Sequence, residues 1–184
     1  MRVTPLGKDP HFIANMVEVG DAVYFVDSGP SIADAIVRLG KEPASVRAVF
    51  TTQSGFGRTA GIPAFADLVN WAWRDCFVRI FFATEDLLHA TERLLFAFLS
   101  QDGRIDRERL RFSLAAAGRV YEDELVTVCY IATDREGGQP TYAILMQERA
   151  SGERTLFLPH GEVLSDDGQE GFCTALSSCG GQMP

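Results

Sequence analysis

Side chains that could bind a metal ion or act in catalysis are few and scattered in this sequence. The three histidines lie in an opening loop, on a predicted helix and after a late strand: His11, His89 and His160. A solvated side chain is the favoured interpretation of His160, ahead of a ligating or catalytic role. The four cysteines lack the spacing of a zinc site, so we expect buried or idle thiols. Two of them, Cys173 and Cys179, could form a disulfide.

A glycine-rich loop over residues 53–58 and the carboxylate of Asp27 are better candidates for a site. Gly55 and Gly57 allow backbone amides to face a ligand, so the loop could bind an anion beside Arg58, although a flexible turn is the simpler interpretation. Asp27 ends an apolar stretch, and a carboxylate at the end of a buried strand needs hydrogen-bond partners. A structural role for Asp27 is favoured over a functional one.

Secondary-structure elements on both sides of this loop must position these residues. Apolar stretches rich in β-branched and aromatic residues predict strands over 12–19, 22–26, 46–51, 78–83, 125–132, 141–147 and 154–158. Apolar residues at helical spacing predict helices over 31–39, 62–75 and 84–99. Gly20-Asp21 is typical of a hairpin turn, and Ser31 and Thr84 are typical helix N-caps. The sequence therefore predicts a layered α/β fold that ends in an antiparallel meander.

Two further segments are expected to be solvated. The arginines between residues 104 and 111 alternate with acidic residues, which favours a charged surface segment over a binding patch. Residues 162–184 are rich in Gly, Ser and Asp, and we expect a partly flexible tail with one weak helical stretch over 172–176. With no repeat or linker, we predict one domain over residues 1–184.

Composition limits the classes of partner. The chain has 184 residues, 46% of them hydrophobic, and a formal net charge of −8. Because polyanions are bound chiefly by clustered Lys and Arg, nucleic acid is not an expected partner. No apolar run approaches the roughly 20 residues that a membrane span needs, and no secretory signal precedes Gly7. We therefore expect a cytoplasmic protein that does not contact membranes.

Two strand ends and the loop between them resemble the metallo-β-lactamase superfamily. Residues 23–29 resemble its strand ending in Asp-Cys/Ser-Gly, and residues 48–52 resemble the strand that leads into its metal loop. That loop reads Thr-His-x-His-x-Asp-His-x-x-Gly-Leu/Ile-Pro in the family. The resemblance extends from about residue 12 to residue 161, and it implies a four-layer αββα sandwich, shortened at its C-terminal end.

The family's metal ligands are absent from this sequence. Anchoring the motif on Thr52 and on 61–63 places these residues at its four ligand positions: Gln53, Gly55, Gly57 and Arg58. His160 stands near the position of the bridging Asp, and Thr133 or Asp134 stands where a further His is expected. The family uses Zn or Fe, but glycine has no donor and Arg58 brings a positive charge, so we expect no metal cofactor. Arg58 could instead pair with Asp27.

The resemblance implies ancestry more than present activity, and three functions stay open. The first is a non-catalytic binding or scaffold module, plausibly a homodimer because a shortened sandwich with thirteen Phe would leave apolar surface to cover. The second is a hydrolase of phosphodiesters or thioesters with a relocated site built from Asp27, Asp134 and His160. The third is a sensor of a small anion at the vestigial loop. A protein partner or an anionic ligand is possible in each case.

Overall fold

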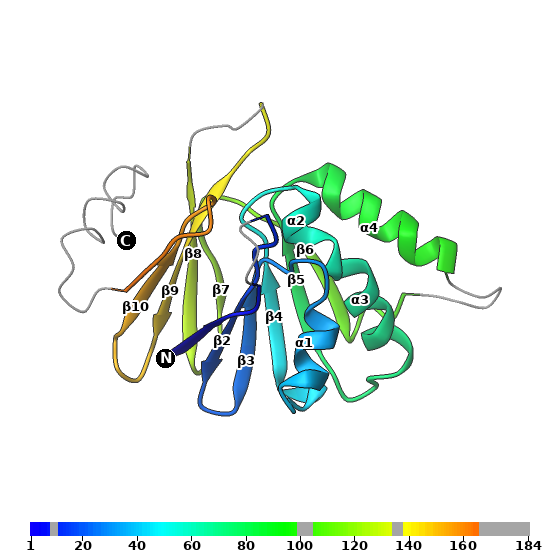
Figure 1. Cartoon of the computed structure of the whole chain (residues 1–184), viewed down its shortest axis with the longest axis horizontal. Coiled ribbons are helices and arrows are strands. Elements are labelled where there is room, and N and C mark those ends of the chain that lie inside the picture. Colours follow the sequence, from blue (N-terminus) through cyan, green and yellow to red (C-terminus); the bar gives the residue numbers. More distant parts are fainter. Residues whose placement is uncertain (8–10, 99–104, 134–137, 166–184) are drawn as a thin grey trace.

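Two β-sheets lie face to face, and helices cover the outer face of the first sheet (Figure 1). The architecture comes from a computed structural model that describes residues 1–7, 11–98, 105–133 and 138–165. The predicted α/β sandwich is confirmed as one layer of helices and two layers of strands. The second outer layer of helices, expected beyond the second sheet, is not found within these ranges. None of the described helices is long and apolar enough to span a membrane.

The first sheet has six strands in the order in which they occur along the chain. They are β1 (Arg2–Pro5), β2 (Asn15–Val19), β3 (Ala22–Val26), β4 (Val46–Phe50), β5 (Val78–Phe82) and β6 (Leu110–Leu114). The predicted hairpin pairs β2 with β3 in antiparallel fashion, whereas β3 to β6 are parallel. The carboxyl ends of β3 and β4 therefore meet at one edge of the sheet, where ligand sites of α/β proteins commonly form.

The second sheet is the predicted antiparallel meander, extended by a strand at each side. Its strands are β7 (Gly118–Glu122), β8 (Val126–Ala132), β9 (Tyr142–Glu148), β10 (Arg154–Phe157) and β11 (Val163–Ser165), and their order is β11-β10-β9-β8-β7. Four strands were not predicted, namely β1, β6, β7 and β11. Each of them has exposed or half-buried positions, so the apolar alternation that marks a strand is weak.

Two of the four described helices, the first and the last, begin where the sequence places N-caps. The four helices are α1 (Ile32–Arg38), α2 (Phe56–Thr59), α3 (Gly61–Trp71) and α4 (Glu85–Phe98), and a short 3₁₀ turn spans Pro43–Ser45. Ser31 Oγ accepts a hydrogen bond from the amide of Asp34 at 3.1 Å, and Thr84 Oγ1 accepts one from Leu87 at 3.2 Å. Both predicted caps are confirmed, since each hydroxyl satisfies an amide that has no partner within its helix.

Alternation along the strands separates two apolar cores. On β3, Val23 and Phe25 pack against α1 and α3, while Tyr24 and Val26 face the second sheet. A strand that is buried on both faces has apolar residues at every position. The continuous apolar run over residues 22–26 therefore predicts β3 clearly. Cys76 is buried, as expected for a thiol in an apolar stretch, and burial raises its pKa to about 11. Cys173 and Cys179, the pair that could form a disulfide, lie outside the described residues.

The arginine run before β6 is only partly the solvated segment that the sequence predicts. Arg107 is exposed and pairs with Glu92, but the side chain of Arg109 is 12% exposed. Its guanidinium donates to the carbonyls of Val69 and Asn70 at 2.7 and 3.0 Å. These carbonyls lie in the last turn of α3, where a helix leaves acceptors unpaired, so Arg109 is a structural cap. Arg104 lies outside the described residues.

Asp123, in the turn between β7 and β8, connects the two sheets. Its Oδ2 accepts hydrogen bonds from the hydroxyls of Tyr24 on β3 and Tyr121 on β7, at 2.6 and 2.8 Å. Its Oδ1 accepts from the amides of Leu125 and Val126. Burial opposes ionisation of Asp123, but the Tyr24 hydroxyl and the amides outweigh it, so its pKa lies below the usual value.

We expect Asp123→Asn to lower the free energy of unfolding at pH 7 by about 2 kcal/mol, because hydrogen bonds to a charged acceptor contribute about 1.5 to 3 kcal/mol. The lowered pKa of Asp123 means that its carboxylate stabilises the fold above an unfolded pKa of about 3.9. That contribution is lost as the pH falls through the folded pKa. Urea titrations between pH 7 and about pH 3 should therefore show the deficit of the variant shrinking.

Glu124→Gln is the matched control, since its side chain is 64% exposed and pairs with Arg47 at the surface. We expect this variant to unfold like the wild type. A deficit of Asp123→Asn no larger than that of Glu124→Gln would show that Asp123 does not hold the sheets together.

Candidate functional site

Three segments that are distant in sequence place a buried ion pair at the carboxyl ends of β3 and β4. Asp27 follows β3, Thr52 lies just beyond β4, and Arg58 belongs to α2. Arg58 Nη1 lies 2.9 Å from Asp27 Oδ2, and the side chains are 10% and 1% exposed. The amide and hydroxyl of Thr52 both donate to Asp27 at 2.8 Å. The ion pair predicted between Arg58 and Asp27 is confirmed.

The backbone of Asp27 is held in an unusual conformation. Its φ is +59°, which makes it the one residue other than glycine with a positive φ in the described part of the chain. For an L-residue this conformation costs about 1 to 2 kcal/mol, and such strain gathers at sites where the surroundings fix the chain. Burial raises the pKa of Asp27, while Arg58 and Thr52 oppose the rise. Removing Arg58 would thus leave a carboxylate that resists ionisation.

An N-terminal loop closes directly over α2. The amide of Ile13 donates to the carbonyl of Gly57 at 3.0 Å, and Ser28 donates to the carbonyl of Arg58 at 2.6 Å. A Cβ atom at position 57 would lie 1.8 Å from the carbonyl oxygen of His11, so only glycine fits there. Position 57 is where the metal-loop motif has its Asp. The backbone of His11 therefore excludes a carboxylate from that position.

The residues at the four ligand positions do not fit a zinc or iron centre. Gly55 and Gly57 carry no donor atom, Arg58 holds a fixed positive charge, and an amide oxygen such as that of Gln53 is a weak ligand for zinc. Gln53 Oε1 is buried, and no described residue forms a hydrogen bond with it. The described residues contain no group of three or more His, Cys, Asp or Glu that could hold a metal ion.

Within the described part of the chain, His160 forms no hydrogen bond or ion pair with Asp27. His160 lies in the turn after β10, where its side chain is 66% exposed and its Nε2 is 3.1 Å from Glu162. Its neighbour Gly161 packs against the side chain of Ile13, so the N-terminal loop lies between this turn and α2. His89 is a surface residue of α4, 52% exposed, as expected. Asp134 lies outside the described residues.

Two residues beside the ion pair were not predicted as site residues. Thr52 served only to align the motif, yet it supplies two of the three donors to Asp27. Tyr130, on the inner face of β8, is fully buried with no hydrogen-bond partner for its hydroxyl among the described residues. Burial raises its pKa, and the charge of Asp27 raises it further. Its alternation with Val128 marks an inward position, but only the fold places it near Asp27.

We expect Asp27→Ala to destabilise the protein by about 3 to 5 kcal/mol, because it leaves the buried guanidinium of Arg58 without a partner. The double variant Asp27→Ala/Arg58→Met should be clearly less destabilised than the sum of the single variants. Chemical denaturation of the four proteins gives the coupling. Single effects that add within about 0.5 kcal/mol would show that the two side chains do not interact.

Gly57→Ala should destabilise the protein by about 3 kcal/mol, because the methyl group would overlap the His11 carbonyl and the loop must move. Gly20→Ala is the matched control: Gly20 has φ of +57° but no neighbour within 4 Å, so only backbone strain of about 1 kcal/mol is expected. Equal urea midpoints for the two variants would refute the close packing at position 57.

Comparison with known proteins supports the fold and leaves the activity open. No protein-family model and no curated protein matches the sequence. Among solved structures, the short form of human tRNase Z superposes with a TM-score of 0.66 at 14% identity, covering 86% of this chain and 68% of that one.

Two other solved structures also superpose on this chain. The metallo-β-lactamase fold protein YhfI from Bacillus subtilis has a TM-score of 0.56 at 14% identity over 80% of this chain. A diphosphatase from the PhnP family has a TM-score of 0.52 at 17% identity over 77% of this chain. The chain spans 54% and 53% of their lengths. Its two facing sheets and these structural neighbours together show that the chain has the metallo-β-lactamase fold.

Proposed function

We propose that this protein is a non-catalytic member of the fold, in which an internal ion pair stands where relatives bind metal and which acts as a binding or scaffold module. The observation that carries the proposal is the contact of 2.9 Å between Arg58 and Asp27. Arg58 aligns with the last His of the metal loop, and its guanidinium supplies the positive charge that a cation would otherwise bring to the buried carboxylate.

The loop around this pair also supports the proposal. The hydrogen bond from Ile13 to Gly57 joins the N-terminal loop to α2, and the backbone of His11 fills the space that an Asp at position 57 would need. A hydrolytic metal site requires several ligands that converge on one ion, together with an open position for water. In this protein the N-terminal loop fills part of the space that such a metal site would need.

The alternative hydrolase is less well supported by the described residues. A general base must come within hydrogen-bond distance of the substrate, but Asp27 is 1% exposed and both of its oxygens accept hydrogen bonds. His160 is exposed, and within the described residues it forms no hydrogen bond or ion pair with Asp27. The anion sensor at the vestigial loop is also disfavoured, because the guanidinium of Arg58 is directed at Asp27.

The proposal includes a homodimer in the cytoplasm. Large apolar side chains are exposed on this chain, including Phe56 at 76% and Phe77 at 63%, and association would cover such surface. The described cysteines, Cys76 and Cys129, are free thiols, which suits a reducing compartment. Light scattering on the eluting protein gives the mass that tests the dimer.

Metal content is the decisive measurement. We expect the protein, purified without a metal-affinity tag, to contain less than about 0.1 equivalent of Zn, Fe or Mn by plasma mass spectrometry. The triple variant Gln53→His/Gly55→His/Arg58→His supplies three of the missing donors and serves as the comparison. About one equivalent in the wild type, lost in Asp27→Ala, would overturn the proposal in favour of a rebuilt hydrolase site.

A further inference from the structure

A row of arginines lies at the opposite end of the first sheet from the ion pair. Arg79 on β5 and Arg111 on β6 are direct register partners, and Arg47 on β4 lies one residue before the partner of Arg79. Each is near the amino end of its strand. With about 3.3 Å per residue, Arg47 is about 16 Å along the strand direction from Thr52, so this row is separate from the vestigial metal site.

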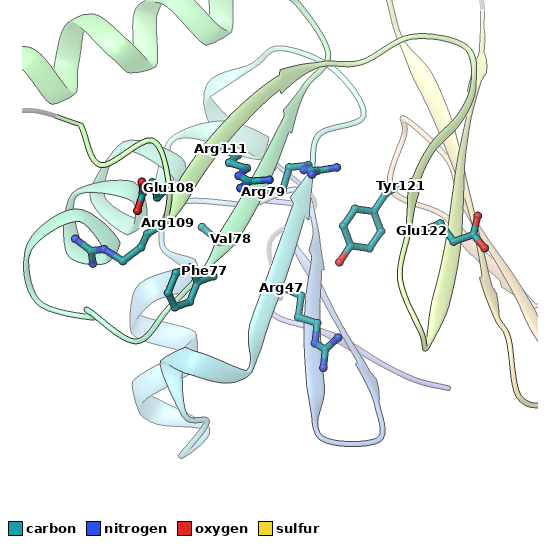
Figure 2. A pocket seen from close by; sticks show the side chains of 9 residues that line it. All are labelled: Arg47, Phe77, Val78, Arg79, Glu108, Arg109, Arg111, Tyr121 and Glu122. Atoms are coloured by element: carbon teal, nitrogen blue, oxygen red, sulfur yellow. The ribbon is translucent and has the colours of Figure 1, made fainter.

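These arginines line a cavity of about 300 Å³ between the edge strands of the two sheets. Figure 2 shows Arg79 and Arg111 together on the first sheet, and the ring of Tyr121 extends from β7 toward the first sheet with its hydroxyl on the side of Arg47. Phe77 contributes an exposed aromatic ring to the lining. The volume is at the lower end of the range for small-molecule sites.

Charge pairing in this cavity is incomplete. Arg47 is satisfied by Glu124 and lies 3.6 Å from Asp123. Within the described residues, by contrast, neither Arg79 nor Arg111 has a carboxylate within 4.0 Å. Neighbouring strands are about 4.8 Å apart, so two like charges repel each other here. In a chain with a net charge of −8, two adjacent arginines without acidic partners mark a place that favours an anion.

The geometry selects a phosphoryl group over a carboxylate. One guanidinium fork already matches the two oxygens of a carboxylate, whereas two forks side by side can donate to separate oxygens of a tetrahedral dianion. Tyr121 is fixed by its hydrogen bond to Asp123, so its ring is a rigid apolar wall for the remainder of a ligand. Glu108 also lines the cavity, and its charge repels an extended polyanion. Glu122 pairs with Arg119 and Arg149 and points away from the cavity in Figure 2.

We propose that this cavity binds a small organic phosphate monoester, with Arg79 and Arg111 holding the phosphoryl group and Tyr121 contacting the organic part. The site does not depend on the state of the metal loop. The proposal assigns a class of ligand to the binding module. It holds even if the protein proves to bind metal at the other end of the first sheet.

Calorimetric titration of the full-length protein with phenyl phosphate tests the site, with inorganic phosphate and benzoate as competing probes. We expect phenyl phosphate to bind at least about fivefold more tightly than either competitor, and to weaken as salt rises from about 50 to 200 mM. Arg79→Gln/Arg111→Gln should weaken phenyl phosphate at least about tenfold, because charge-assisted hydrogen bonds are lost. Arg93→Gln, at an exposed position of α4, is the matched control and should bind like the wild type.

Each other outcome overturns the proposal in a definite way. Equal affinity for inorganic phosphate would assign the cavity to free phosphate, and tighter benzoate binding would assign it to carboxylates. Absence of heat at about 5 mM phenyl phosphate, or an equal loss in Arg93→Gln, would remove the site altogether. Should the double variant fold poorly in a thermal melt, Arg111→Glu alone provides the test, since Arg111 is exposed. Metal analysis of the same sample reports separately on the proposed function.

Discussion

A carboxylate buried at the end of a β-strand must be neutralised, and the organisation of this site follows from that constraint. Asp27 cannot stay ionised at 1% exposure without a positive charge and hydrogen-bond donors beside it. Arg58 supplies the charge and Thr52 supplies two donors, so β3, β4 and α2 are fixed relative to one another. The positive φ of Asp27 is a cost that these three contacts offset.

The same end of the molecule is fixed a second time by its backbone. Ile13 and Ser28 donate to carbonyls of α2, and Gly61 donates to Gly29. These hydrogen bonds bring the first hairpin, the loop after β3 and the start of α3 into one unit. At the other end, the arginine cavity is built from the amino ends of three parallel strands and from β7. The two ends share strands but no side chain, so each can change without the other.

Much of the fold was predictable because its signals are local. A short stretch of sequence is enough to predict each of these features: the Gly20-Asp21 hairpin, the caps at Ser31 and Thr84, and the strands of the meander from residue 126 onward. The ion pair was predictable for a different reason: the resemblance to the metal-loop motif, aligned on Thr52 and Gly61, indicated which residue stands at each ligand position. Arg109 escaped prediction because its role depends on carbonyls of α3, about forty positions earlier in the chain.

Other features depend on strand register and could not be found from the sequence. Arg79 and Arg111 are far apart in the chain, and only the β5–β6 pairing makes them neighbours. The contact between Tyr24 and Asp123 likewise needs both sheets to be in place. β6 and β7 are edge strands with mixed exposure, so periodicity did not reveal them, and the cavity that they border was hidden for the same reason.

The close approach of His11 to Gly57 limits which residues position 57 can hold. Because the N-terminal loop packs directly on the glycine, the backbone of His11 opposes an Asp at that position whether or not a metal ion is present. A single substitution that introduces a carboxylate at position 57 is therefore opposed by folding alone. The packing of this loop thus keeps a side chain out of position 57, whereas the surface at the other end of the first sheet is not limited by that contact.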